Sequence, residues 1–155
     1  MKHKPTPAGI VILVSGFVIV IASFFAFYTF KTPQLTFGST RVGGTASFNA
    51  WDKVSLFPVS ILPAICGLLM GTRVATLTWS DLRIADRVLG LAWQQLHLVL
   101  GFQAAIVMIA FLIRDNSALS FGFGFWLMLV ASIGLAVGAV MLNREPATAT
   151  GPAAA

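Results

Sequence analysis

The sequence is short of charged residues and has almost no cysteine. Only 10% of its 155 residues are charged, whereas a soluble domain carries about 25%. Together with a hydrophobic share of 57%, this excludes a water-covered surface for most of the chain and indicates that lipid surrounds it. The single cysteine, Cys66, excludes an internal disulfide and any cluster of cysteine metal ligands.

Negative charge is scarcer than positive charge. Ten Lys and Arg stand against five Asp and Glu, which gives a formal net charge of +5. The basic residues fall in connectors and tails and form no stripe with interleaved aromatics. We therefore exclude nucleic-acid binding and interpret the excess as a signal of membrane topology.

Long apolar runs dominate what is present. They cover residues 8–30, 54–77, 88–113 and 121–142. Each exceeds the roughly 20 residues that a helix needs to cross a bilayer. The sequence thus predicts an all-α integral membrane protein, a four-helix transmembrane bundle in a single membrane domain over 8–142. The first run is longer than a signal-peptide core and lacks a cleavage site, so we expect it to be a retained span.

The distribution of Lys and Arg predicts the orientation of the bundle. The two tails and the 73–87 connector carry six basic residues near span ends, and the opposite side carries four. Because the cytoplasmic side is the more basic one, both termini are expected there. The short tail 1–7 precedes the first span, and the Ala- and Pro-rich tail 143–155 is expected to be disordered.

The external connector, residues 31–53, is the one long polar segment. Gly43 and Gly44 offer a tight turn, which would close a short β-hairpin on the outer face. Asn49 and Asp52 suit the start of the next helix, and Trp51 suits the membrane interface. We interpret these residues as the start of a helix with an anchor at the membrane interface, rather than as part of a binding loop.

Small residues on the spans predict close helix packing, because apolar burial no longer drives association inside lipid. Pro58 and Pro63 are expected to bend the second span near its outer end. The candidate packing glycines at four-residue spacing are Gly67 and Gly71 in the second span and Gly134 and Gly138 in the fourth.

The stretch "WQQLHLVLG" places polar side chains inside the third apolar run. On a helix, one face carries Gly90, Trp93, Gln94, His97 and Gly101. Unpaired Gln and His are costly in hydrocarbon, so this face should contact another helix or a partner protein. Two further glutamines, Gln95 and Gln103, point away from it.

His97 is the one ionisable residue well inside a span, and the sequence does not supply the further ligands that a cofactor or metal site requires. Bis-histidine haem needs a second buried histidine, and His3 lies in the tail; a zinc site needs three or four ligands. We therefore expect no catalytic, cofactor or metal site.

Two functions are compatible with these patterns. The preferred one is a non-enzymatic accessory or assembly subunit of a larger complex in a bacterial plasma membrane, with the lipid bilayer and other membrane subunits as its partners. The alternative is a small transporter or a lipid- or ligand-binding protein, with a polar cavity lined by Gln94, Gln95, His97 and Gln103.

The layout resembles that of small four-span membrane proteins of high-GC Gram-positive bacteria. The outer loop ending in "SFNAWD", the proline-interrupted second span and the Ala/Pro tail carry this resemblance. It implies a bacterial plasma membrane and transfers no activity. The chain departs from claudin-like proteins, which have paired loop cysteines, and from small multidrug exporters, which have a first-span glutamate.

Overall fold

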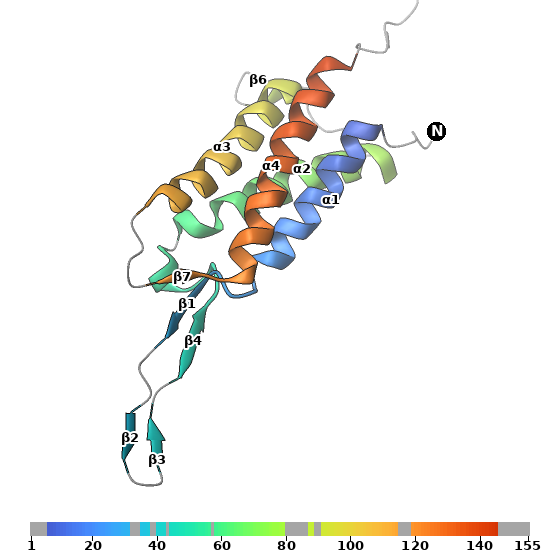
Figure 1. The fold of residues 1–155 in the computed structure, drawn as a ribbon. Helices are drawn as coiled ribbons and strands as arrows, with labels where there is room; N and C mark the ends of the chain where they lie inside the picture. The colour runs from blue at the N-terminus through green and yellow to red at the C-terminus, as the bar shows by residue number, and fades with distance from the viewer. Residues whose placement is uncertain are drawn as a thin grey trace, which may run out of the picture.

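Four α-helices make up most of the structure, a computed structural model (Figure 1). It describes residues 6–31, 35–37, 40–42, 44–56, 58–79, 87–88, 91–114 and 119–145. The helices are α1 (Pro7–Ala22), α2 (Leu62–Trp79), α3 (Trp93–Ile113) and α4 (Phe123–Arg144). Helix α4 packs against α1 and α3, and α2 packs against the same two helices, so the four form a ring around a shared core.

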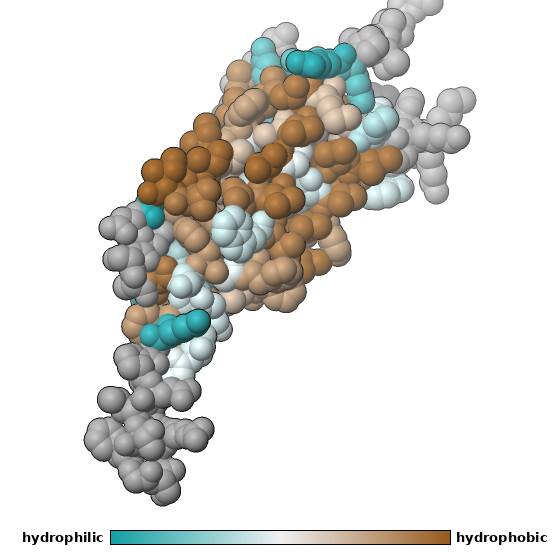
Figure 2. Space-filling model, in the orientation of Figure 1, coloured by the Kyte–Doolittle hydropathy of each residue, from teal (hydrophilic) through white to brown (hydrophobic). Residues whose placement is uncertain are grey.

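Three of these helices are candidates for membrane spans. By length and composition, Val59–Trp79, Trp93–Ile113 and Phe123–Arg144 are long and apolar enough to cross a bilayer, while α1, with 16 residues, is shorter. Large apolar side chains also cover the outside of the bundle (Figure 2). Phe17 and Val130, for example, are each 68% exposed.

Helix α1 ends well before the predicted limit at residue 30. The Ser23 hydroxyl donates to the Val20 carbonyl at 2.6 Å, and the next two backbone N–H groups bond three residues back, which tightens the chain into turns. The segment that follows, "FFAFYTF", is rich in aromatic residues that favour extended chain. The end of the first apolar run is accordingly a strand.

A small sheet caps one end of the bundle. Its central strand β1 (Tyr28–Lys31) pairs antiparallel with β4 (Thr45–Phe48) and with β7 (Ser120–Phe121), which precedes α4. Beyond it, β2 (Leu35–Phe37) and β3 (Thr40–Val42) form a second antiparallel pair that projects away from the helices (Figure 1). The chain reverses between β2 and β3. The sequence suggested a turn at Gly43–Gly44, and Gly43 lies outside the described residues.

We call the end of the bundle that carries this sheet the sheet end, and the opposite end, where α1 begins and α4 ends, the terminal end. At the terminal end β5 (Arg87–Val88) pairs with β6 (Leu91–Ala92). Helix α3 therefore begins at Trp93, five residues after the predicted start of the third span.

Helix α2 also begins later than predicted. Asn49 and Asp52 form a local turn, in which the Asn49 N–H donates to the Asp52 carboxylate at 2.8 Å. Two 3₁₀ turns, η1 (Lys53–Ser55) and η2 (Val59–Ile61), then lead into the helix. Pro63 lies in the first turn of α2, where no intrahelical bond is lost. Pro58 precedes η2, so both prolines lie at the entry to the helix.

An aromatic cluster joins the sheet to the helices. The Phe27 ring, fully buried, meets the rings of Tyr28, Phe111 and Phe125 edge-on at centroid distances of 5.0, 5.2 and 5.3 Å. Phe121 of β7 stacks on Phe125 at 4.0 Å. Edge-to-face pairs of this kind contribute beyond their buried area, so the sheet end is fixed to α3 and α4.

Candidate functional site

Three side chains from α2 and α3 gather near the terminal end, and we call them the His97 cluster: Arg73, Trp93 and His97. His97 is 3% exposed, and its Nδ1 lies 2.6 Å from the Trp93 carbonyl oxygen, one turn earlier on α3. The guanidinium carbon of Arg73, on α2, lies 4.6 Å from the centroid of the Trp93 ring. This arrangement is a cation–π contact between two packed helices.

The geometry of His97 fixes the role of each ring nitrogen. A carbonyl oxygen only accepts, so Nδ1 carries the hydrogen and donates to Trp93. In a neutral imidazole the other nitrogen, Nε2, is then an acceptor. Nε2 is buried and has no hydrogen-bond partner within the part of the chain that the structure describes. The Met70 backbone of α2 and the fixed positive charge of Arg73 both act on the His97 ring.

The glutamines of the same stretch do not join this cluster. Gln94 is exposed. Gln95 is exposed too, and its side-chain oxygen accepts the Ala92 N–H at 3.2 Å, which caps the start of α3. Gln103 lines an outward-facing hollow with the apolar residues Val99, Phe102, Ile106 and Val107. The structure thus separates these glutamines from His97 rather than gathering the four side chains around one cavity.

The buried face of α3 is built from small and apolar residues. It comprises His97, Gly101, Ala104, Ala105, Met108 and Phe111. A Cβ placed on Gly101 would lie 3.0 Å from the Leu135 carbonyl oxygen and 3.1 Å from the Ala136 Cα. The α3 backbone therefore runs directly against the α4 backbone at this point, with little room for a side chain at position 101.

The other candidate glycines divide into two groups. A Cβ on Gly67 or on Gly138 would collide with α1, at Ile19 and Ile12 respectively, and one on Gly134 would collide with the Ser15 hydroxyl. Gly71 differs, because a Cβ there would meet no atom within 4 Å. Gly90 lies outside the described residues.

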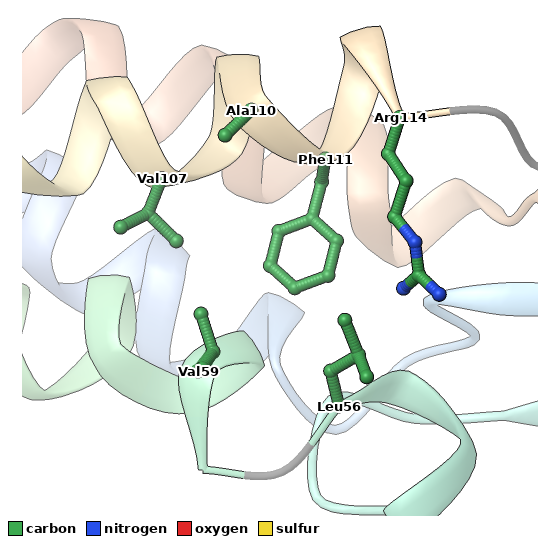
Figure 3. Close-up of a pocket in the computed structure, with 6 residues that line it drawn as sticks. All are labelled: Leu56, Val59, Val107, Ala110, Phe111 and Arg114. Atoms are coloured by element: carbon green, nitrogen blue, oxygen red, sulfur yellow. The ribbon is translucent and has the colours of Figure 1, made fainter.

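Sequence reasoning missed two features. Arg73 entered only as a topology signal, although it reaches the Trp93 ring across the helix interface. The second is a groove of about 170 Å³ near the sheet end, lined by Leu56, Val59, Val107, Ala110, Phe111 and Arg114 (Figure 3). We call it the sheet-end groove. The signal for it was the spacing of 107, 110, 111 and 114, which puts these residues on one helix face.

Metal ligands do not converge in the described residues: no three His, Cys, Asp or Glu side chains come together there. Comparison with protein-family models and with curated proteins found no match to the sequence.

Proposed function

We propose that the protein is a four-span integral membrane protein. The apolar exteriors of the helices support this, because large contiguous apolar surfaces are rare on water-soluble proteins. The positions of the tryptophans add support. Trp51 and Trp126 lie at the sheet end, and Trp79 and Trp93 lie at the terminal end, as expected for side chains that anchor at the two membrane interfaces.

In this proposal the sheet end faces outward from a bacterial plasma membrane, and both termini lie in the cytoplasm. The basic residues near the span ends support this orientation. The two outer connectors then meet in one sheet, since β1 and β4 flank the first connector and β7 ends the second.

Within that membrane the protein acts as a non-enzymatic accessory or assembly subunit. The observation that carries this role is the paired β2–β3 extension, which projects from the bundle (Figure 1). Ordering the backbone costs roughly 1–2 kcal/mol of conformational entropy per residue. Strands β2 and β3 pair with each other, and the bundle is complete without them, so the bundle does not account for this cost. The extension is therefore proposed to contact an external partner.

The test removes the extension and leaves the bundle intact. Lys31 and Thr45 are paired in the β1–β4 ladder, so an Asn-Gly turn in place of residues 32–44 closes a tight hairpin. The trimmed protein should keep the wild-type melting temperature in detergent and lose its partners in mild-detergent purification from native membrane. The matched control keeps the length of the extension and exchanges Thr45 for Ser. Equal partner recovery by trimmed and wild-type protein would refute the role of the extension.

The alternative, a transporter with a polar cavity on the third span, has less support. It needs Gln94, Gln95 and Gln103 to face His97, and these three side chains are exposed while His97 is buried.

A further inference from the structure

The sheet-end groove combines an apolar lining with a single charge. Leu56 and Val59 form one wall, and Val107, Ala110 and Phe111 of α3 form the other. Arg114, which follows the last residue of α3, supplies the one charged side chain of the lining. Figure 3 shows its guanidinium on the same side of α3 as the Phe111 ring, at one end of the groove. The groove is thus apolar along its length and cationic at one end.

The wall opposite α3 is held in a fixed shape by its own backbone. Leu56 has a φ of 62° and is the one non-glycine residue with positive φ among those described. The Leu56 N–H donates to the Lys53 carbonyl at 3.2 Å, and the Val59 N–H donates to the Leu56 carbonyl at 2.8 Å. A left-handed conformation is unfavourable for a branched side chain and persists only where its surroundings enforce it. The wall is therefore part of the fold, and Leu56 stays 41% exposed.

We propose that the sheet-end groove binds one acyl chain of an acidic phospholipid, with the headgroup phosphate on Arg114. This inference rests on the proposed membrane function, which puts the groove at the outer interface of the bilayer. The apolar walls suit a hydrocarbon chain, and a guanidinium matches a phosphate in charge and in hydrogen-bond geometry. A zwitterionic lipid offers no net charge for Arg114, so the acidic headgroup is the preferred one.

Native mass spectrometry of protein extracted from vesicles tests the proposal. The vesicles contain equal parts of phosphatidylglycerol and phosphatidylcholine, and the measured quantity is the ratio of the two lipids retained by the protein. Wild type should retain phosphatidylglycerol in excess. Arg114→Gln should lower this preference by up to about fivefold, the effect of losing one exposed charge pair. Ala110→Phe fills the groove and should lower the retention of both lipids severalfold.

Two matched controls separate this site from general effects. Lys53→Gln removes another exposed charge near the same end, and Ile109→Phe adds bulk at the neighbouring position of α3, outside the groove. Both should retain lipid like wild type. Equal losses in Arg114→Gln and Lys53→Gln would overturn the headgroup assignment. Lipid retention by Ala110→Phe equal to that of Ile109→Phe would overturn the assignment of the groove as a lipid site. The assignment would also be overturned if Ala110→Phe lost a protein partner and kept its lipid.

Vesicle flotation distinguishes failure of this inference from failure of the membrane proposal. A protein that does not float with the vesicles contradicts both. One that floats and shows no lipid preference contradicts only the lipid site.

Discussion

The two ring nitrogens of His97 have different surroundings. One donates to the chain of its own helix, and the other is buried without a partner among the described residues. A buried polar atom without a partner costs free energy, so the protein should gain little stability from this imidazole.

Replacing His97 with Leu tests this view of the residue. The substitution keeps the apolar bulk and removes the unengaged nitrogen, so the free energy of unfolding should change by no more than about 1 kcal/mol, since membrane-helix hydrogen bonds average about 0.6 kcal/mol. Melting in detergent measures it, and partner recovery from native membrane is measured in parallel. A large loss of stability in the isolated protein would mean that Nε2 has a structural partner within the chain.

Gly101 and Gly71 form a matched pair of helix glycines with different surroundings. A Cβ at position 101 would press on the α4 backbone, whereas one at position 71 would meet no atom within 4 Å. Gly101→Ala should therefore destabilise the protein by about 1–3 kcal/mol through overpacking. Gly71→Ala should leave stability unchanged or raise it by up to about 1 kcal/mol, the helix-propensity gain. Similar melting temperatures for the two variants would contradict the close approach of α3 and α4.

Among the elements, composition predicted the helices better than their ends. Hydropathy predicted four helices of spanning length, and three long apolar helices and one shorter one, α1, are present. Hydropathy could not place the end of α1, because "FFAFYTF" is as apolar in a strand as in a helix. Tertiary contacts determine where α1 ends. The Trp51 indole donates to the Ser23 hydroxyl at 3.1 Å and stacks on Phe24, and these partners are far apart in the sequence.

The candidate residues, too, could be predicted only in part from the sequence. Helical periodicity puts His97 and Gly101 on one face, and the structure buries both. It also put Gln94 on that face, but Gln94 is exposed in the structure. The Arg73–Trp93 contact joins two helices, and no periodicity within one helix specifies a partner on another.

For the molecule as a whole, the orientation in the membrane is the property to test. In a Cys66→Ala background, Thr45→Cys on β4 should react with an impermeant thiol reagent in intact cells. Asn143→Cys, near the end of α4, should react only after the cells are opened. Both positions are exposed, so burial does not explain a difference between them. The reverse pattern would invert the proposed topology and leave the four helices unchanged.

The pairing of β1 with β7 also constrains the order in which the molecule is made. The Thr29 hydroxyl donates to the Ser120 carbonyl, a partner 91 residues later in the chain. At synthesis rates of about 5–20 residues per second, β1 emerges roughly 5–18 seconds before this partner exists. During that interval β1 has one unpaired edge, and the Phe27 ring lacks Phe125. The sheet end is therefore completed only after α3 has been synthesised, and until then the nascent chain exposes a strand edge to which chaperones or assembly partners can bind.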